Sequence, residues 1–319
     1  MKKLLLGIAA VCLAGFTFAQ DAPLWMRHSV ISPDGTTIAF TYKGDIYTVP
    51  VAGGRAMQIT TNPAYDTAPV WSPDSKRIAF ASDRMGSLDV YIVAKDGGEP
   101  RRLTTHSGSE TPLAFTDAGH VLFSAGIMPS AEAVVFPSNG QFNQVYRVSV
   151  EGGRPTMISS MPMECISINK EGAMLYQDKK GYEDYWRKHH VSPIARDIWM
   201  YTPGKEPQYR QLTTFGGEDR EPVWAPDGKT FYYLSEENGS FNIYRRTPGD
   251  AKAVQLTHYT KNPVRYLSAA TDGRLCYGFD GEIYTLLPGG EAQKVNISIV
   301  SDRNDKDIIR QIKSSGAPD

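Results

Sequence analysis

The sequence has 319 residues, of which 41% are hydrophobic and 22% charged, and its net charge at neutral pH is −1. A chain of this length can bury a large core in one or two domains. No basic block and no stripe of alternating basic and aromatic residues occurs, so nothing in the sequence indicates a nucleic-acid partner.

The first residues have the pattern of a secretory signal peptide. Lys2 and Lys3 precede an apolar run over residues 4–13, and Thr17-Phe18-Ala19 fits the small-x-small cleavage rule. We therefore expect a signal peptide over residues 1–19 and a periplasmic or secreted protein, whose net charge falls from −1 to about −3 when the two lysines are removed. The run is too short to span a bilayer, and no second long apolar run follows, so no membrane span is expected after cleavage.

Four short phrases then recur in a fixed order. The first is a turn whose proline fixes φ, whose aspartate bonds its own backbone and whose glycine accepts a positive φ, which predicts tight hairpin turns. Its clearest copies are residues 32–35, 72–75 and 225–228. The second phrase is an alternating β-rich run that begins near residues 37, 77, 120, 173, 230 and 274.

The third phrase places a polar residue, a β-branched residue and an aromatic residue in succession. Its copies are residues 45–47, 89–91, 144–146, 197–199, 242–244 and 282–284. The fourth phrase closes each unit, at residues 58–60, 102–104, 157–159, 211–213, 255–257 and 295–297. The closing Thr or Ser positions 60, 104, 159, 213 and 257 are 44, 55, 54 and 44 residues apart, the length of a propeller blade.

Four strands joined by tight turns form one antiparallel sheet, and six consecutive sheets predict an all-β, six-bladed β-propeller of four-stranded blades over residues 20–300. A β-sandwich would not repeat the same four phrases in constant order. The units run without offset, so the ring is expected to close without a borrowed strand, although residues 22–27 could add a closing edge. Cys165 and Cys276 fall in different units; we expect both to be buried strand residues and no disulfide to join them.

The repeat resembles a known family. Ser72-Pro73-Asp74, Ile78-Ala79-Phe80 and the segment 82–86 resemble the TolB-type, WD-like propeller repeat. Residues 181–190, which include Trp186-Arg187-Lys188-His189-His190, and residues 196–199 resemble the first propeller of tricorn-like serine proteases; the resemblance covers about residues 25–310.

That resemblance implies a second propeller, a PDZ-like domain and a serine peptidase domain, none of which this sequence contains. It therefore implies that the chain is an N-terminal fragment, or a product that lost its catalytic half, with residues 301–319 as a linker. The peptidase's catalytic residues match no position here. No Gly-x-Ser-x-Gly elbow occurs either, and the recurring Asp34, Asp74 and Asp227 serve turn formation, so we predict no catalytic residue and no cofactor.

Loops on one face of the predicted ring carry the candidate binding residues. The third and fourth units contain long insertions, at about residues 126–142 and 179–195, and recognition usually lies on such loops of a rigid scaffold. We predict a mixed-charge rim that captures or admits extended peptides or unfolded protein segments. Its members are Asp66, Arg84, Glu110, His189, His190, Asp219 and Arg220. The alternative is that these charges cap strand ends and solvate the face.

Two other functions stay open from sequence. His106, His258 and one of His189 and His190 should open onto the same face, which would suit a metal-dependent hydrolase or lyase if three ligands converged. We expect no metal, because adjacent histidines on an extended segment point in opposite directions. The second alternative is a TolB-like scaffold that docks folded envelope proteins rather than peptides.

Overall fold

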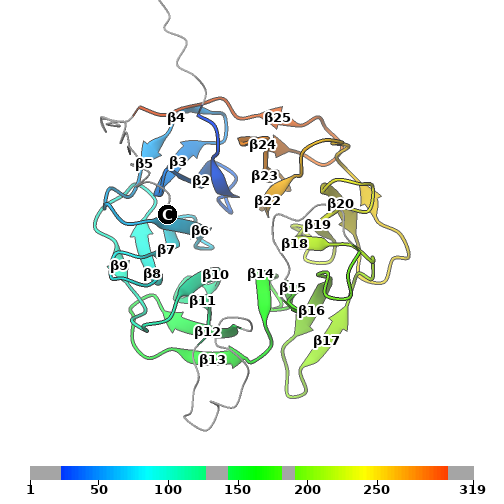
Figure 1. Ribbon diagram of the computed structural model, residues 1–319, viewed down its shortest axis with the longest axis horizontal. Coiled ribbons are helices and arrows are strands. Elements are labelled where there is room, and N and C mark those ends of the chain that lie inside the picture. The colour runs from blue at the N-terminus through cyan, green and yellow to red at the C-terminus, as the bar shows by residue number, and fades with distance from the viewer. Residues whose placement is uncertain (1–22, 127–142, 182–190, 301–319) are drawn as a thin grey trace, which may run out of the picture.

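The computed structural model describes residues 23–126, 143–181 and 191–300. Six four-stranded antiparallel sheets are arranged as blades around a central axis (Figure 1), which confirms the predicted six-bladed propeller. In the described ranges, no helix is long and apolar enough to cross a membrane.

The first three blades follow the first three sequence units. The strands of blade 1 are β1 (Arg27–Ile31), β2 (Thr37–Tyr42), β3 (Asp45–Pro50) and β5 (Met57–Gln58). Those of blade 2 are β6 (Asp66–Trp71), β7 (Arg77–Ser82), β8 (Asp89–Ala94) and β9 (Arg101–Arg102). Those of blade 3 are β10 (Glu110–Asp117), β11 (His120–Ala125), β12 (Gln144–Ser149) and β13 (Thr156–Ser159).

The remaining blades follow the same order. The strands of blade 4 are β14 (Met163–Ile168), β15 (Met174–Asp178), β16 (Ile198–Thr202) and β17 (Gln208–Gln211). Those of blade 5 are β18 (Asp219–Trp224), β19 (Phe231–Ser235), β20 (Asn242–Arg246) and β21 (Val254–Gln255). Those of blade 6 are β22 (Arg265–Ala269), β23 (Leu275–Phe279), β24 (Glu282–Leu286) and β25 (Gln293–Lys294).

The second and third phrases recur because their aromatic residues meet across the blade. In blade 2, Phe80 lies opposite Tyr91 in the antiparallel register, and their ring centroids are 5.9 Å apart. Equivalent pairs occur in four other blades, with centroids 5.6 to 5.8 Å apart: Phe40–Tyr47, Phe123–Tyr146, Tyr233–Tyr244 and Tyr277–Tyr284. Cross-strand aromatic pairs stabilise a sheet beyond the area they bury.

The core lies between blades rather than within them. Ile46 of blade 1 packs against Ile78 and Phe80 of blade 2, and Leu122 of blade 3 packs against Met163 and Tyr176 of blade 4. One sheet cannot bury both of its faces alone, so each blade depends on its neighbours. This dependence explains why the ring must be closed.

The ring closes through a pairing that the sequence did not reveal. Strand β26 (Ile297–Ser298) lies parallel to β4 (Gly54–Arg55), a short strand between β3 and β5 of blade 1. Every blade takes its four strands from its own unit, as expected, and this separate two-stranded pair joins the end of the ring to blade 1. The fourth strand of blade 6 is β25, and the phrase predicted for it, residues 295–297, lies mostly between β25 and the closing strand β26.

Candidate functional site

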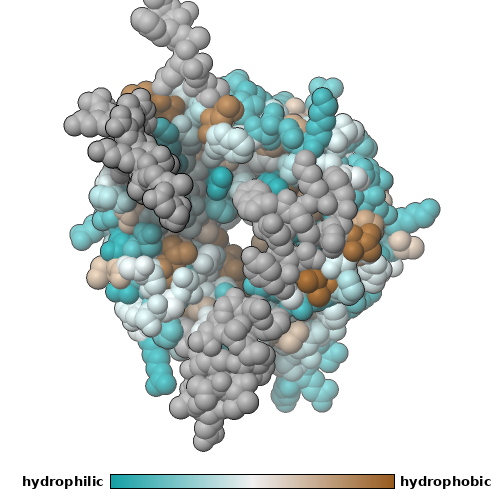
Figure 2. Space-filling view, viewed as in Figure 1, coloured by the Kyte–Doolittle hydropathy of each residue, from teal (hydrophilic) through white to brown (hydrophobic). Residues whose placement is uncertain are grey.

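The axis of the ring is surrounded by the first strand of every blade. Strands β1, β6, β10, β14, β18 and β22 each stand at one end of their sheet's strand order, so one edge of each pairs with no other strand of its sheet. Figure 1 shows these strands around the centre, and Figure 2 shows an opening there. We call this opening the channel.

Every innermost strand contains a β-bulge at a similar height. The register of pairing with the second strand shifts between Arg27 and Val30 in blade 1, and at corresponding places in the other five blades. In five blades the bulge holds a non-glycine residue with a positive φ of 49° to 57°. These residues, which we call the bulge ring, are His28, Ala68, Cys165, Glu221 and Tyr266. Left-handed non-glycine residues are uncommon and gather where a backbone is shaped for function.

His28 connects three blades at the seam of the ring. Its ring centroid lies 4.9 Å from that of Tyr266 in blade 6, and its Nδ1 is 3.1 Å from Thr67 Oγ1 in blade 2. Burial, assisted by the neighbouring Arg27, lowers the pKa of His28 to about 4. The imidazole is therefore neutral at physiological pH, and it contributes no charge to the channel.

Cys165 corrects one of the sequence predictions. It lies in strand β14, as expected, but it is exposed, whereas Cys276 is buried. Both are free thiols. Protein atoms nevertheless surround Cys165, and this desolvation, reinforced by Glu221 and Glu164, raises the pKa of its thiol. The thiol is thus reachable by solvent but a poor nucleophile.

Asp66 and Arg84, two of the predicted rim residues, are largely buried. Asp66 is the first residue of β6 rather than a loop residue, and its side chain is fully buried. Arg84 Nη2 donates to both carboxylate oxygens of Asp66, at 3.1 and 3.0 Å, and the guanidinium lies 4.4 Å from the ring centroid of Tyr91. Of the two, only Arg84 keeps some exposure, at 13% of its side chain.

Glu110 lies at the junction of blades 2 and 3, at the start of β10, and is also buried. Neither of its carboxylate oxygens has a well-aligned hydrogen-bond partner among the described residues. Burial and the nearby carboxylate of Asp89 raise the pKa of Glu110 to about 7, although Thr104 opposes the shift. Asp89 is itself paired with Arg102, whose Nη2 is 2.8 Å from Asp89 Oδ2.

Asp219 and Arg220 begin strand β18 and are both buried. Arg220 Nε donates to Glu218, which also accepts a bond from Arg196 Nη1 at 3.4 Å. Arg196 reaches on to Glu164 of blade 4, with Nε 3.2 Å from Glu164 Oε2. This network, in which only Glu164 is partly exposed, joins blades 4 and 5. An exposed rim at Asp66, Glu110, Asp219 and Arg220 is therefore not what the structure shows. The charges instead fix strand starts at the blade junctions.

The histidines do not form a metal site in the part of the chain that is described. His189 and His190 lie outside the described residues, as does most of both long insertions. His106 Nδ1 accepts a hydrogen bond from the Gly108 N–H at 2.9 Å, as in a local turn. Within the described ranges, no three His, Cys, Asp or Glu residues lie close enough together to hold a metal ion.

Sequence reasoning missed the bulge ring, although a signal for it was present. Pro69, Pro112 and Pro222 interrupt three of the innermost strands. Proline cannot donate to a sheet ladder and is confined to edges and bulges. These prolines therefore marked both the unpaired edge of each strand and the bulge beside it.

Comparison with known proteins agrees with this architecture. Residues 23–292 match the family described as the tricorn protease N-terminal beta propeller domain. Over 289 residues the chain is 26% identical to Tricorn protease homolog 1 of Streptomyces coelicolor, an alignment that covers 89% of this chain. The crystal structure of the tricorn protease is similar, with a TM-score of 0.73 at 19% identity. This superposition covers 89% of the present chain and 27% of the tricorn protease chain.

TolB from Acinetobacter baumannii is a more distant structural neighbour. Its TM-score is 0.60 at 13% identity, over 85% of this chain and 62% of TolB, which shows a shared fold. The chain spans about a quarter of the length of the curated relatives it matches, 26% of the Streptomyces coelicolor protein and 26% of the Tricorn protease homolog of Saccharolobus solfataricus.

Proposed function

Because the chain belongs to the family of tricorn protease N-terminal β-propeller domains, we propose that it is a non-catalytic ring that admits extended peptides to a peptidase. In this proposal the peptidase lies elsewhere in a longer protein or assembly. The signal-like residues 1–19 favour a periplasmic or secreted location for the whole.

The observation that carries the proposal is the wall of the channel. The innermost strand of each of the six blades turns an edge that is unpaired within its own sheet toward the axis. Edge strands present N–H and C=O groups, which pair with an extended chain whatever its side chains are. A peptidase that degrades many sequences needs such sequence-tolerant recognition at its entrance.

The chemistry of the bulge ring suits the same role. Ala68 is small, His28 is neutral because burial lowers its pKa to about 4, and Tyr266 offers an aromatic face. The carboxylate of Glu221 already accepts a hydrogen bond from the Leu267 N–H at 2.8 Å. Of the five bulge-ring side chains, only Glu221 is acidic, and the other four are neutral groups that would not select peptides by charge.

Narrowing the channel at Ala68 tests the proposal. Ala68→Phe adds a large side chain to an innermost strand, at a residue whose β-carbon the left-handed backbone already accommodates. Binding of short unstructured peptides, measured by fluorescence anisotropy, should weaken by about tenfold or more, because extended chains would no longer fit. Ala94→Phe is the matched control, since Ala94 is an exposed alanine at the end of β8 in the same blade.

Equal peptide binding by wild type, Ala68→Phe and Ala94→Phe would contradict passage through the channel. Thermal melts of the three proteins should coincide within a few degrees, which separates blockage from misfolding. If peptides do not bind but folded envelope proteins are retained equally by wild type and Ala68→Phe, the result would favour a TolB-like scaffold.

A further inference from the structure

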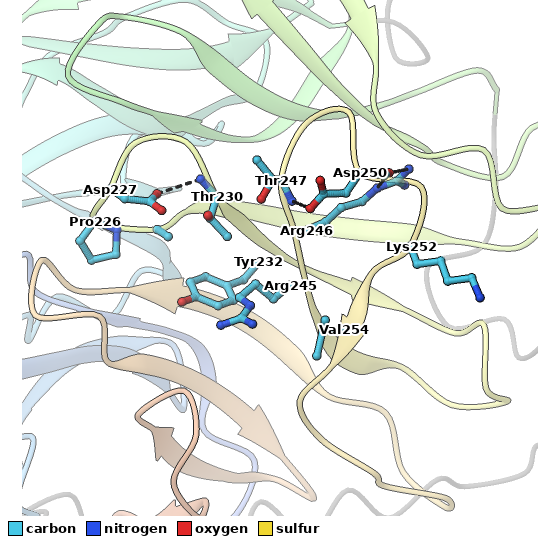
Figure 3. Close-up of a pocket in the computed structure, with 11 residues that line it drawn as sticks. Pro226, Asp227, Thr230, Tyr232, Arg245, Arg246, Thr247, Asp250, Lys252 and Val254 are labelled. Atoms are coloured by element: carbon cyan, nitrogen blue, oxygen red, sulfur yellow. Dashed lines mark hydrogen bonds between the residues drawn. The ribbon is translucent and has the colours of Figure 1, made fainter.

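A cavity of about 470 Å³ lies on blade 5 (Figure 3), and its lining residues do not belong to the innermost strand β18. Its walls come from the turn between β18 and β19, from strands β19 and β20, and from the segment that leads into β21. The lining residues include Asp227, Tyr232, Arg245, Asp250, Lys252 and Val254.

One row of side chains crosses the blade at this cavity. Tyr232 of β19 lies opposite Arg245 of β20, which lies opposite Val254 of β21. Residues directly opposite in an antiparallel sheet share a face, and Figure 3 shows Tyr232 and Arg245 side by side. A guanidinium thus lies beside an aromatic ring and an aliphatic side chain.

The acidic groups of the cavity are already occupied by the backbone. Asp227 Oδ1 accepts from the N–H groups of Lys229 and Thr230 at 2.9 and 2.8 Å, and these bonds outweigh burial to lower the pKa of Asp227. Asp250 Oδ2 accepts from the Thr247 N–H at 3.3 Å. Both carboxylates therefore hold turns in place.

The three cations of the cavity differ in whether they already have a partner within the fold. Arg246 is committed to the carbonyl oxygen of Asp250, to which its Nε and Nη2 donate at 3.0 and 2.6 Å. Arg245 and Lys252 are exposed, and neither has a hydrogen-bond or ion-pair partner among the described residues. An exposed arginine elsewhere in the ring does have a partner within the fold, because Arg101 of blade 2 pairs with Glu151 of blade 3 at 2.7 Å. The two cavity cations are thus left for a partner outside the fold.

We propose that this cavity binds an acidic peptide segment through its carboxylate side chains. Arg245 offers a planar fork that matches a carboxylate, and Lys252 offers a second cation on a separate loop. A cavity of about 470 Å³ is much larger than a single carboxylate requires, and Tyr232 and Val254 provide apolar contact for the rest of the segment. The cavity and the channel wall are formed by different parts of blade 5. Binding of acidic peptides at the cavity therefore does not depend on the proposed function of the channel.

Calorimetric titration with designed peptides tests the inference. The probe is an alternating Glu-Ala peptide blocked at both ends, with a Gln-Ala peptide of equal length as its neutral counterpart. Wild type should bind only the Glu-Ala peptide, with an affinity that falls as salt rises. Arg245→Ala and Lys252→Ala should each weaken binding by about tenfold, and the double variant should abolish it.

Arg147→Ala is the matched control. Arg147 is exposed on β12 of blade 3 and lies opposite Leu122 and Thr156. Its position in blade 3 is equivalent to that of Arg245 in blade 5, but it does not line the cavity. Its loss should leave binding unchanged. The inference is overturned if the double variant binds as wild type does, if Arg147→Ala weakens binding equally, or if the Gln-Ala peptide binds as well. It is also overturned if the blocked Glu-Ala peptide fails to bind but a Gln-Ala peptide with a free C-terminal carboxylate does, because the site would then recognise chain ends.

Discussion

Buried carboxylates at the blade junctions make individual residues sensitive to pH. Asp219 is buried, its Oδ1 has no hydrogen-bond partner among the described residues, and burial raises its pKa from 3.8 to about 7. The folded protein therefore holds this proton more tightly than the unfolded chain does. The contribution of Asp219 to stability is fully present below about pH 4 and is lost as the pH rises through about 7.

Asp219→Asn should remove that dependence. The amide cannot ionise, yet it keeps an acceptor for the hydroxyls of Ser235 and Thr213, which oppose the pKa shift in the wild type. From about pH 5 to about pH 8 the wild type should lose on the order of 1–3 kcal/mol more unfolding free energy than the variant does. Urea denaturation at both pH values measures the difference, with the exposed Asp96→Asn as a control. Equal slopes for wild type and Asp219→Asn would show that the buried group does not titrate in this range.

At the scale of the strand, the closing threonine acts as a clip. In four blades its Oγ1 accepts, at 2.9 Å, the backbone N–H of a residue at the start of the third strand: Ile46 to Thr60, Val90 to Thr104, Ile198 to Thr213 and Ile243 to Thr257. In blade 5 the same hydroxyl donates to Asn242 Oδ1, also at 2.9 Å. The recurring Leu-Thr phrase therefore fastens the outer strand to the third strand.

Thr257→Val should cost about 1–3 kcal/mol of unfolding free energy, because the buried Ile243 N–H loses its acceptor, whereas Asn242 Oδ1 keeps the bond from the Tyr259 N–H. Valine has nearly the same shape as threonine, so packing is preserved. Thr257→Ser keeps the hydroxyl and should recover most of the loss in urea denaturation. If the valine variant were as stable as the wild type, the hydrogen bonds of the Thr257 hydroxyl would not contribute to stability.

The strands and their order could be read from the sequence because the information is local. The turn at Pro73-Asp74 and the pairing of Phe80 with Tyr91 involve residues close in sequence, and an equivalent aromatic pair recurs in four other blades. The site could not be read in the same way. Arg196 joins Glu164 and Glu218, which are 32 and 22 residues away, and only the placement of blades 4 and 5 side by side reveals that these charges meet.

For the whole molecule, stability depends on how the two ends of the ring are joined. The backbone N–H groups of Gly54 and Ala56 donate to the carbonyl oxygens of Asn296 and Ser298, at 2.8 and 2.9 Å. A strand of two residues shows no alternation in sequence, which is why β26 was not predicted. These bonds link the end of blade 6 to blade 1, so every blade gains two neighbours, and the cost of opening the seam is shared by the ring.

Gly53 is the position at which this closure can be tested. Its φ is +85°, and a β-carbon there would lie 2.5 Å from the carbonyl oxygen of Asn296. Gly97 occupies the same turn of blade 2 with a φ of +91°, but a β-carbon there meets nothing within 4 Å. Gly97→Ala should therefore cost only the left-handed backbone penalty, about 1–2 kcal/mol.

Gly53→Ala should cost that penalty and a further ~1–3 kcal/mol, because the methyl group forces the closing strand away from blade 1. Urea denaturation of both variants gives the difference, and limited proteolysis should cut Gly53→Ala between β25 and β26 faster than it cuts Gly97→Ala. If the two variants proved equally stable and equally resistant, the parallel pairing of β26 with β4 would not be what holds the ring closed.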